Sequence, residues 1–469
     1  MTEPVRQADS AELGLIGLGP MGRALALNLA DHGVWVRGTD ASSAARAAAE
    51  GASERLAVTA NTVPMINGLR RPRRVLLCVP AAEVGSVLGE LIPLLDDGDT
   101  VVDAGNSDFR LTRQRVLDLA ARRLHLVGLG VSGGPRGARR GASLMLGGDR
   151  AICEGLGDLL RPIAAAGPHG ACIVDCGAGA AGHFTKTVHN GIEYALLQLV
   201  CEAYELLRGA GKASSEIASI FANWQRGPLR SYLVGLAAGV LATPNGSREG
   251  EARVDHIQDV AGYGGTGVWA LQAASDLAVP TPVLAAALGA RFLSSRQRQR
   301  RLLRFAAPPA VDPPASSLSP QVLESALAGA MICAWDEGIA LLGAGSQAYE
   351  FGTDAAAVVA AWCGGSILRS ELAERVHEQL RLERRVLGGA ILEAARAAEP
   401  AWRRTVAAGA RTGVPLPALA SALAYFDGCR QDPAPARLLQ ALRDAFGSHG
   451  YRRIDRSGEH TGGWRTDDD

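Results

Sequence analysis

Residues Leu13–Gly22 read LGLIGLGPMG, an apolar run followed by three glycines in the spacing G-x-G-x-x-G. The first glycine of such a turn permits a tight bend, the second lets the backbone approach a pyrophosphate, and the third lets a helix pack on the strand. The helix expected over Met21–His32 would direct its first N–H groups at the phosphates. An ordinary glycine-rich turn is the alternative, but the flanking strand and helix favour a cofactor. The stretch predicts a dinucleotide site at Gly17, Leu18, Gly19, Pro20, Met21 and Gly22.

Strand-like and helical segments alternate through the first 180 residues. This alternation predicts a parallel, doubly wound sheet. The expected strands are Leu13–Gly17, Val34–Arg37, Val75–Val79, Thr100–Asp103, His125–Gly128, Ser143–Leu146 and Cys172–Asp175.

Near Gly177–Gly182 the pattern changes to long alanine- and leucine-rich stretches with helical periodicity, the longest at His183–Gly209. Helical stretches of similar length flank the proline- and serine-rich segment Pro308–Pro320, which suggests a duplication without a fixed short repeat. The predicted fold class is α/β. It comprises an N-terminal Rossmann-like dinucleotide-binding domain (residues 1–180), a large all-α domain (181–432) and a C-terminal tail (433–469).

Composition narrows the classes of protein. Acidic and basic residues balance at 48 each, so the sequence lacks the basic excess expected of a nucleic-acid binder. The sequence has no run of about 18 apolar residues, so no membrane span is expected, and the N-terminal residues do not resemble a secretory signal. The eight scattered cysteines are expected to be reduced and buried rather than metal-binding. We therefore expect a cytoplasmic protein without a metal site, a membrane anchor or a nucleic-acid partner.

Asp40 lies 18 residues after Gly22, near the end of the second expected strand. This is close to the separation expected of an acidic residue that binds the adenosine ribose of a dinucleotide. A carboxylate there accepts hydrogen bonds from ribose hydroxyls and repels a 2′-phosphate, so the sequence favours NAD, with NADP as the alternative cofactor. A role for Asp40 as a helix N-cap is compatible with the ribose role.

The segment Gly182–Tyr194 reads GHFTKTVHNGIEY and carries polar residues at positions i, i+3, i+4, i+7 and i+8. Residues at this spacing share one face of a helix, and apolar residues occupy both sides of that face. A solvated polar face is the alternative, but the apolar flanks favour a buried helix whose polar stripe faces a cavity. The stripe consists of Lys186, His189, Asn190, Glu193 and Tyr194.

Lys186 is one of only two lysines among the 48 basic residues; the other is Lys212. Arginine cannot lose its proton in a protein, whereas a desolvated lysine titrates near neutral pH. A lysine in an arginine-rich chain therefore indicates a proton that must be removed, which favours a catalytic role for Lys186 over a structural one.

Together with Val101–Ser107 (VVDAGNS), Val131–Gly134 (VSGG) and Arg443–Tyr451 (RDAFGSHGY), this segment resembles the 6-phosphogluconate dehydrogenase family over essentially the whole chain. The resemblance implies an oxidative decarboxylase acting on a phosphorylated sugar acid. It also implies a homodimer with shared active sites, in which the C-terminal tail reaches the partner subunit and the all-α domain provides substrate binding and dimerisation.

The resemblance also implies residue roles. Lys186 would be the general base for the substrate 3-hydroxyl, and Glu193 the general acid that protonates C1 of the enediol to give ribulose 5-phosphate. Cofactor contacts would add Val79 and Asn106 to Asp40 and the glycine turn. The implied sugar-acid contacts are Asn106, Ser132, Gly133, Gly134, His189 and Asn190, and the implied phosphate contacts are Tyr194, Thr266, Arg291 and, from the partner, Arg443, with His449 reaching the substrate from the tail.

The chain departs from the family pattern at four sites. The glycine turn reads GLGPMG where the family has GLAVMG, a variation found in the wider β-hydroxyacid dehydrogenase superfamily. The usual GQKGTGKW reads GYGGTGVW, so Gly264 and Val268 replace two lysines. The usual Asn-Arg-Thr after the second strand reads Asp40-Ala41-Ser42, and the usual Glu-Glu after VSGG reads Pro135-Arg136. A paralogue that oxidises a related phosphorylated hydroxy acid in a specialised pathway, and a non-catalytic dinucleotide-binding relative, are therefore alternatives to a true 6-phosphogluconate dehydrogenase.

Overall fold

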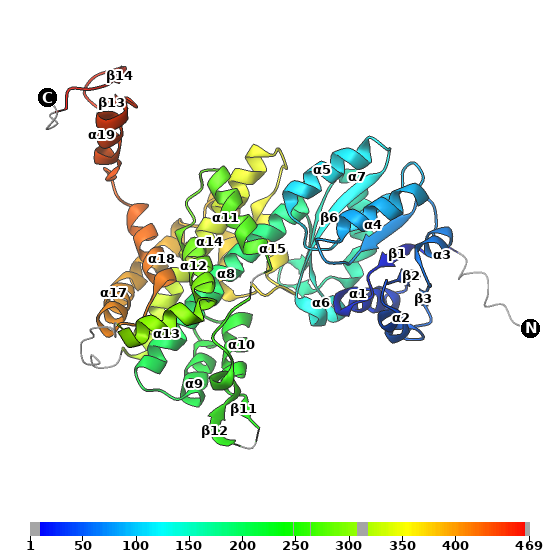
Figure 1. Cartoon of the computed structure of the whole chain (residues 1–469), viewed down its shortest axis with the longest axis horizontal. Helices are drawn as coiled ribbons and strands as arrows, with labels where there is room; N and C mark the ends of the chain where they lie inside the picture. The colour runs from blue at the N-terminus through cyan, green and yellow to red at the C-terminus, as the bar shows by residue number, and fades with distance from the viewer. Residues whose placement is uncertain (1–9, 247, 263, 307–317, 465–469) are drawn as a thin grey trace, which may run out of the picture. The chain divides into compact units, whose positions relative to one another are not determined.

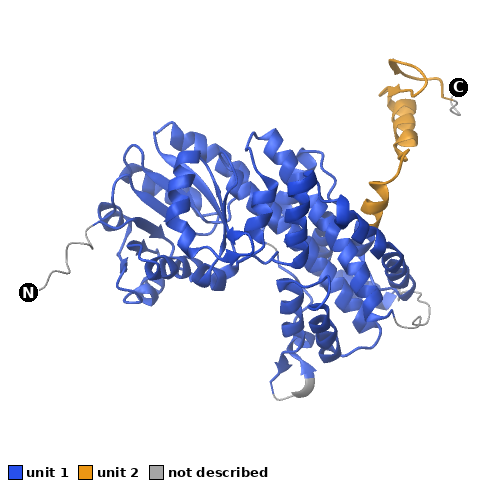
Figure 2. Ribbon diagram, turned by 180° about the vertical axis from the view of Figure 1, so that it is seen from behind, with its two compact units in different colours: residues 1–422 blue, residues 423–469 orange. Residues whose placement is uncertain are grey.

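The computed structural model describes residues 10–246, 248–262, 264–306 and 318–464. The chain forms two compact units, residues 1–422 and 423–469, which Figure 2 shows in two colours. Within the first unit, Figure 1 shows the strand-rich part in blue and cyan and the helical part from green through yellow to orange. This order agrees with the predicted fold class. The units do not coincide with the three predicted domains, whose boundaries stay predictions.

The strand-rich part is built on one eight-stranded sheet with the order β10-β7-β6-β5-β4-β1-β2-β3. The six strands from β6 to β3 in this order run parallel to one another. Six of the seven predicted strands match within two residues at each end, whereas β6 continues four residues beyond its predicted end. Strand bounds are β1 Leu13–Ile16, β2 Val36–Thr39, β3 Leu56–Val58, β4 Arg74–Leu77, β5 Thr100–Asp103, β6 His125–Ser132, β7 Ser143–Gly147 and β10 Ile173–Asp175.

The prediction of a wholly parallel sheet is wrong at two strands, β7 and β10, which run opposite to the other six. β7 pairs antiparallel with β6, and β10 pairs parallel with β7. Only residues 133–142 connect β6 to β7, and they hold the short helix α6 (Gly134–Arg140). A parallel return needs a crossover of a dozen or more residues, so this connection returns the chain antiparallel. The three-residue strand β3 and the small hairpin of β8 (Ala166–Gly167) and β9 (Gly170–Ala171) were not predicted.

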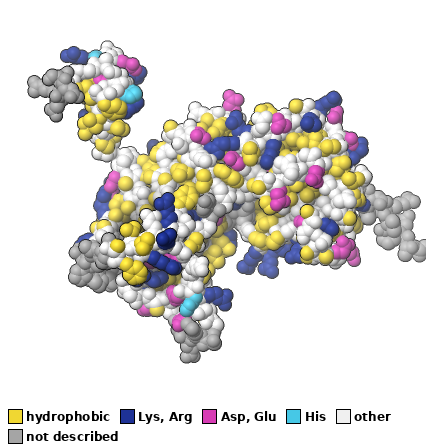
Figure 3. Space-filling model, viewed as in Figure 1, with side chains coloured by type: hydrophobic (Ala, Val, Ile, Leu, Met, Phe, Trp, Pro, Cys, Tyr) yellow, Lys and Arg dark blue, Asp and Glu magenta, His cyan; other side chains and the backbone are white. Residues whose placement is uncertain are grey.

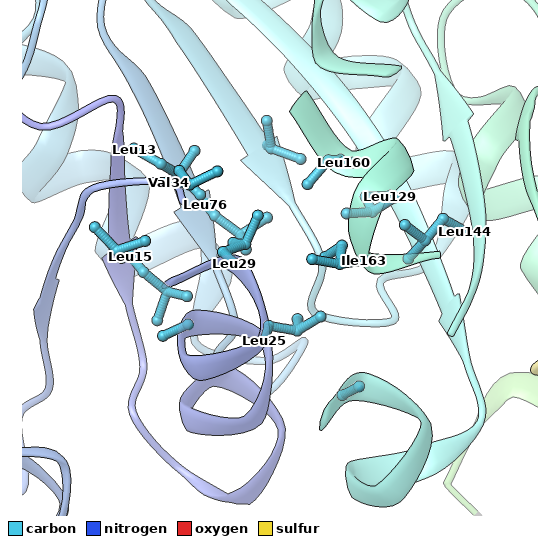
Figure 4. Packing of buried hydrophobic residues seen from close by; sticks show 14 of the residues in the cluster. Leu13, Leu15, Leu25, Leu29, Val34, Leu76, Leu129, Leu144, Leu160 and Ile163 are labelled. Carbon is cyan, nitrogen blue, oxygen red and sulfur yellow. The ribbon is translucent and has the colours of Figure 1, made fainter. Parts of the chain in front are cut away.

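Helices cover both faces of the sheet, as expected of a doubly wound fold. On one face Leu25 and Leu29 of α1 point toward Leu15 and Leu76 of the sheet (Figure 4). The opposite face is covered by an apolar cluster that includes residues of α3, α4 and α5. The helix predicted over Met21–His32 is α1, one residue earlier at each end. Helix bounds are α1 Pro20–Asp31, α2 Ser43–Ala49, α3 Thr62–Asn67, α4 Val84–Leu91, α5 Phe109–Ala120 and α7 Arg150–Leu160.

The second part of the first unit is helical, with one exception. A small hairpin of β11 (Pro244–Asn245) and β12 (Arg248–Ala252) interrupts the region that was predicted to be all-α. Of the predicted segment Pro308–Pro320, residues 308–317 lie outside the described part of the chain. Helix bounds are α8 Ala181–Gly209, α9 Ser214–Trp224, α10 Tyr232–Leu241, α11 Thr266–Asp276, α12 Pro282–Ser294, α13 Gln297–Ala306, α14 Pro320–Ala348, α15 Ala355–Trp362, α16 Glu371–Glu383 and α17 Gly389–Thr412. Helix α18 (Pro417–Gly428) begins in the first unit and ends in the second.

The two longest helices, α8 and α14, have 29 residues each and pack against one another. The segments that lead into α12 and α18 also match, since residues 279–284 read VPTPVL and residues 414–419 read VPLPAL. Pro282 and Pro417, the first residues of these two helices, differ by 135 in number. The matched segments support the suggested duplication.

Two buried glutamates connect the two repeats. Glu337 of α14 accepts hydrogen bonds from the first backbone N–H groups of α12, with Val283 N at 3.0 Å from Oε1. Glu202 of α8 accepts them from the start of α18, with Ala418 N and Leu419 N both at 2.8 Å. These glutamates also differ by 135 in number. Each long helix therefore caps the short helix of the other repeat.

Helix α14 is the one described helix that is long and apolar enough to cross a membrane, judged by length and composition alone. Its most apolar window has a mean hydropathy of 1.4, but 78% of that window is buried inside the protein. Asp336 and Glu337 interrupt the apolar residues, which is why no continuous apolar run was found in the sequence. The position of α14 is that of a core helix.

The second unit is built around α19 (Ala436–Gly447) and the strand pair β13 (Tyr451–Arg452) and β14 (Glu459–His460). Asp444 is its organising residue, since its carboxylate accepts hydrogen bonds from Gly450 N, Thr461 Oγ1, Gly462 N and Trp464 Nε1. Burial would raise the pKa of Asp444, but these donors lower it to about 2. Apolar side chains gather on the helix of this unit (Figure 3), where Leu438, Leu439, Leu442 and Phe446 are exposed.

Candidate active site

A cavity of about 940 Å³ lies where the carboxyl end of the sheet meets the helical part of the first unit. Seven of the predicted catalytic and substrate-binding residues line it, together with Met21 of the glycine turn. Met21 and Asn106 connect the cavity to the predicted dinucleotide site. The seven residues are Asn106, Ser132, Gly133, Gly134, Lys186, Asn190 and Glu193.

Close packing of α8 on the sheet sets the position of Lys186. Gly130 lies on β6 directly under the helix, and a Cβ at Gly130 would come within 2.7 Å of Lys186 Cβ. Gly182, in the first turn of α8, approaches the Gly128 carbonyl too closely to carry a side chain. Because both contacts require glycine, α8 can press its N-terminal half onto the sheet. Lys186 is consequently 8% exposed although it faces a cavity.

Lys186 and Glu193 have pKa values shifted in the directions that proton transfer requires. Burial lowers the pKa of the Lys186 amine to about 8, although the nearby Glu193 charge acts to raise it. Burial raises the pKa of Glu193, although the charges of Lys186 and Arg291 act to lower it. A lysine that is readily neutral and a carboxyl that is more readily protonated form a base and an acid in one cavity.

His189 lies behind the cavity wall and is fully buried. Its Nε2 is 2.8 Å from Ser366 Oγ and 3.0 Å from Ser132 Oγ, and its Nδ1 is 3.1 Å from Asn190 Oδ1. An amide oxygen only accepts, so the ring carries its proton on Nδ1, and Nε2 accepts from a serine hydroxyl. Burial and the Lys186 charge hold the pKa of His189 well below its usual value. The neutral imidazole orients Ser132 and Asn190, and Lys186 Nζ lies 3.5 Å from Nδ1.

Three of the predicted phosphate-binding residues are not part of this cavity wall in the described residues. The Arg291 guanidinium lies 3.7 Å over the Tyr194 ring and donates to the Gly262 carbonyl. Tyr194 Oη accepts from Gly264 N at 3.5 Å, and Thr266 is the buried first residue of α11. Tyr194 thus forms a cluster with Arg291, whose charge also acts on Glu193 at the end of the stripe. Gly264 and Val268 leave this cluster without the two lysines of the family pattern.

Arg443 and His449 lie in the second unit, on either side of the organising residue Asp444. Arg443 is exposed and its Nη1 donates to Gln440 Oε1. The His449 ring stands edge-on to Phe446, with 6.0 Å between ring centroids. Their predicted reach into a partner subunit stays a prediction.

The glycine turn has the geometry that a dinucleotide needs. Gly17 has a φ of +101°, and Val79 Cγ1 lies 3.1 Å from where a Cβ at Gly17 would stand. A Cβ at Gly22 would collide with the Gly17 carbonyl oxygen, so the third glycine keeps α1 close to the strand. No side chain caps the N-terminus of α1, and Gly19 faces open space. These residues fit the pyrophosphate of a nicotinamide dinucleotide.

Asp40 lies beside this turn. Its Oδ2 accepts from Leu18 N at 2.6 Å and its Oδ1 accepts from Ser42 N at 2.7 Å. Ser42 is the N-cap of α2, so the alternative role of Asp40 as the helix cap is wrong. Arg46 donates to the Asp40 carbonyl at 2.6 Å, which places one guanidinium near the carboxylate.

Several cavity residues were not predicted. Arg136, Arg140, Tyr232 and Arg369 line the cavity, and Ser366 contacts His189 from the loop before α16. Arg136 was noted in the sequence as a replacement for a glutamate, and no role was predicted for the other four. Among the described residues, no group of histidines, cysteines and carboxylates could hold a metal ion.

Comparisons with known proteins agree across the chain. A family model described as the NAD binding domain of 6-phosphogluconate dehydrogenase matches residues 12–177, and one described as the C-terminal domain of 6-phosphogluconate dehydrogenase matches residues 182–464. The decarboxylating 6-phosphogluconate dehydrogenase of Synechococcus elongatus is 38% identical over 97% of this chain and 99% of its own length. A decarboxylating enzyme of Saccharomyces cerevisiae is 36% identical over 94% and 92%.

A solved structure also resembles the chain over nearly its full length. The 6-phosphogluconate dehydrogenase of Plasmodium falciparum, studied with NADP+ and with 6-phosphogluconate, superposes with a TM-score of 0.92 at 28% identity. The match covers 97% of this chain and all of the other.

Proposed function

The chain belongs to the 6-phosphogluconate dehydrogenase family of nicotinamide-dependent oxidoreductases, and we propose that it oxidises and decarboxylates 6-phosphogluconate to ribulose 5-phosphate with NAD+ as the preferred cofactor. The observation that carries this proposal is the meeting of Lys186, Asn190 and Glu193 with Ser132 in one cavity that continues to the glycine turn. A dinucleotide-binding relative without catalysis would not need a desolvated lysine beside a raised-pKa carboxyl.

The proposed reaction begins at the substrate 3-hydroxyl. Neutral Lys186 takes the hydroxyl proton while C3 loses hydride, for which the bound nicotinamide supplies the acceptor. Protonated Lys186 then hydrogen-bonds the new ketone, which accepts the electron pair when the C1 carboxylate leaves as carbon dioxide. Glu193 donates a proton to C1 of the resulting five-carbon enediol, which was C2 of the sugar acid, and ribulose 5-phosphate is released. Ser132, Gly133 and Gly134 present neutral donors to the carboxylate, and His189 keeps Ser132 and Asn190 in place.

The preference for NAD+ rests on Asp40 and on its neighbour Ala41. The Asp40 carboxylate is next to the Leu18 amide, where the adenosine ribose is expected, and Ala41 stands where the family pattern has an arginine. A 2′-phosphate there would face a negative charge. The NADP+ named for the Plasmodium enzyme makes this chain's preference a point for measurement.

Steady-state kcat/KM with each cofactor tests the preference. We expect NAD+ to be favoured in the wild type and Asp40→Asn to reduce the difference between cofactors. Arg46→Gln is the matched variant, because the Arg46 guanidinium donates to the Asp40 carbonyl and would support any residual use of NADP+. A wild-type preference for NADP+ would show that Asp40 does not select the cofactor.

We also propose a cytoplasmic homodimer with shared active sites, without a membrane or nucleic-acid partner. The exposed apolar face of α19 supports it, because a lone helix with four exposed large apolar side chains gains stability by packing against another chain. Mixing Arg443→Ala chains with Lys186→Ala chains tests sharing, since a mixed dimer would regain one complete site. A fully active monomer in sedimentation would contradict the proposal.

Absorbance at the NADH band with 6-phosphogluconate and each cofactor tests the reaction itself, with carbon dioxide release as the second readout. Gly264 and Val268 replace the two lysines of the family pattern, which favours a second candidate substrate, a related phosphorylated hydroxy acid. A panel of phosphorylated sugar acids separates the two candidates. No turnover with any of them, together with tight dinucleotide binding, would indicate the non-catalytic alternative.

A further inference from the structure

A buried histidine joins the first turn of α8 to the strand-rich part of the first unit. His183 lies one turn before Lys186 and is 1% exposed. Its Nε2 is 2.9 Å from the backbone carbonyl oxygen of Asp103 at the end of β5, and its Nδ1 is 2.7 Å from Thr112 Oγ1 of α5. One ring therefore connects α8 to both β5 and α5, although the proposed mechanism gives this residue no role.

The two hydrogen bonds define the state of the His183 ring. A carbonyl oxygen only accepts, so Nε2 carries the ring proton and donates it, and Nδ1 accepts from the Thr112 hydroxyl. Burial lowers the pKa of His183; the charges of Asp103 and Asp108 act to raise it, and that of Arg115 acts to lower it. Both nitrogens of the neutral ring have protein partners. The ring is therefore placed to hold the elements that it connects rather than to exchange a proton with the substrate.

Asp103 also holds the loop that presents Asn106 to the cavity. Its Oδ1 accepts from Gly105 N at 2.8 Å, and its Oδ2 accepts from Ser107 Oγ at 2.7 Å. Asn106, between these two partners, has a φ of +53°, a left-handed conformation that asparagine adopts more readily than most residues. Asp103 thus fixes the Asn106 loop through its carboxylate and His183 through its carbonyl.

Two glycines of β6 lie under this part of α8. Gly128 and Gly130 are two residues apart, so they face the same side of the strand. A Cβ at Gly128 would come within 3.1 Å of His183 Nδ1, and Gly130 has the corresponding place under Lys186. The histidine and the lysine therefore rest on neighbouring positions of one strand. Movement of His183 away from β5 would lift Lys186 from the sheet and admit water to its amine.

We propose that His183 is a positioning residue that holds Lys186 at a set distance from the Asn106 loop. The base and the loop predicted to contact the cofactor come from different elements, α8 and β5, and His183 links these elements directly. In the proposed reaction the hydride and the proton leave C3 and its hydroxyl, so the lysine and the nicotinamide must be placed together. A misplacement of about 1 Å can cost about 10²-fold in rate. The inference rests on the proposed function and adds a residue to it.

His183→Phe tests the link in the full chain, because phenylalanine fills the place of the ring and makes neither hydrogen bond. Thr112→Val removes only the donor to Nδ1, and Thr112→Ser restores that donor. His377→Phe is the matched control. His377 is also buried and its Nδ1 donates to the Ala356 carbonyl at 2.8 Å, but it does not line the cavity. Chemical denaturation of every variant measures the stability that is lost with a buried hydrogen bond.

Two readouts follow Lys186 itself. The first is the reactivity of its amine toward an acid anhydride as a function of pH, read by peptide mapping with mass spectrometry, which needs no turnover. Lys212 is the internal reference, since these are the two lysines of the chain. The second readout is kcat and the KM for 6-phosphogluconate across pH. The titratable and charged neighbours of the amine, which no variant changes, are His189, Glu193, Arg136, Arg140 and Arg369.

The wild-type amine should gain reactivity with a midpoint near its pKa of about 8. In His183→Phe, water at the amine should raise this midpoint by about one pH unit, which lowers the neutral fraction, and hence kcat at neutral pH, about tenfold. KM should change less than kcat. Thr112→Val should shift the midpoint in the same direction by a smaller amount. Thr112→Ser and His377→Phe should follow the wild type.

The proposal is overturned if His183→Phe folds and keeps the wild-type midpoint and kcat, or if Thr112→Ser behaves like Thr112→Val. Should His183→Phe not fold, the comparison of the two Thr112 variants decides. Absence of 6-phosphogluconate turnover in the wild type would count against the proposed function, whereas the labelling midpoints would still decide the role of His183.

Discussion

Helices α8 and α14 are the corresponding long helices of two repeats, yet only one of them carries the reacting residues. Both have 29 residues, and both use a buried glutamate, Glu202 or Glu337, to cap the short helix of the opposite repeat. The positions of α14 that correspond to Lys186, Asn190 and Glu193 are Gln321, Ser325 and Ala328. These three face a cavity too, one of about 300 Å³. Both repeats therefore have the long helix with its capping glutamate, but only α8 has the reacting residues.

The difference separates two reasons for burying a charged group. Glu202 and Glu337 are buried because each satisfies backbone N–H groups at a helix start, which are otherwise without partners. Lys186 is buried but caps no helix, and burial lowers its pKa to about 8. Burial that a scaffold needs should appear in both repeats, whereas burial that the reaction needs should appear in one. Substitutions in the two helices can test this distinction.

Lys186→Arg should have the largest effect. Arginine keeps the positive charge but cannot lose its proton at working pH. We expect kcat to fall about 10²–10⁴-fold, the usual cost of losing a general base. Substrate binding should change less, because most of the cavity wall is intact.

Lys212→Arg is the control for that substitution, since Lys212 lies after the end of α8 and does not line the cavity. It should leave kcat unchanged. Substantial turnover in Lys186→Arg would mean that Lys186 supplies only a positive charge. A general base would then not be what distinguishes α8 from α14.

The pH dependence of the reaction should show the same lysine. Lys186 acts as a base when it is neutral, so kcat/KM should rise with pH and level off above the pKa of about 8. In Glu193→Gln the negative charge that raises the Lys186 pKa is absent, so the rising limb should move to lower pH. Loss of the general acid should also lower kcat by about 10² or more.

Glu205→Gln is the matched control, because Glu205 lies on the same helix, half exposed, with Arg208 as its partner at 3.9 Å. Its pH profile should coincide with that of the wild type. A Glu193→Gln limb at the wild-type position would show that the two groups do not interact.

The glycine turn, the helix α1 and the polar stripe of α8 could be predicted because each depends on residues close together in sequence. The antiparallel direction of β7 depended on the length of one connection. The roles of Ser366 and Arg369 could not be predicted, because folding brings them from more than 170 residues away to His189 and the cavity. Tyr194 shows the converse. Its helical spacing predicted that it lines the cavity, but its ring stacks with Arg291 and is not part of the described cavity wall.

The shared scaffold should respond in both repeats. Glu337→Ala leaves the first N–H groups of α12 without their acceptor, and Glu202→Ala does the same at α18. A buried unsatisfied donor costs about 1–3 kcal/mol, so we expect each variant to lose stability by about that amount. Chemical denaturation at neutral pH measures it, and Glu205→Ala should change stability by less than about 0.5 kcal/mol.

Glu337→Gln separates the hydrogen bonds that cap α12 from the titration of the Glu337 carboxyl group. Burial raises the pKa of Glu337 from its ordinary 4.5 to about 8, although Val283 N and Leu284 N act to lower it. The folded protein therefore holds this proton more tightly than the unfolded chain, and the wild type should lose stability as the pH rises from about 4.5 to 8. The glutamine variant lacks this loss. Parallel pH dependences would show that the carboxyl titrates normally.

The smallest effect is expected at the position of α14 that matches Lys186. Gln321 is exposed and faces the second cavity, where Gln321, Ser325 and Ala328 stand in place of the lysine, asparagine and glutamate of α8. Glu324, whose pKa is raised by burial, also lines this cavity. Gln321→Ala should therefore leave kcat and KM unchanged and alter the free energy of unfolding by less than about 0.5 kcal/mol. The same pair of measurements on Lys186→Ala, which should abolish turnover, supplies the contrast. A tenfold fall in kcat for Gln321→Ala would mean that the second cavity acts on the reaction through the packed pair α8 and α14, and the division between a repeated scaffold and a single catalytic face would be wrong.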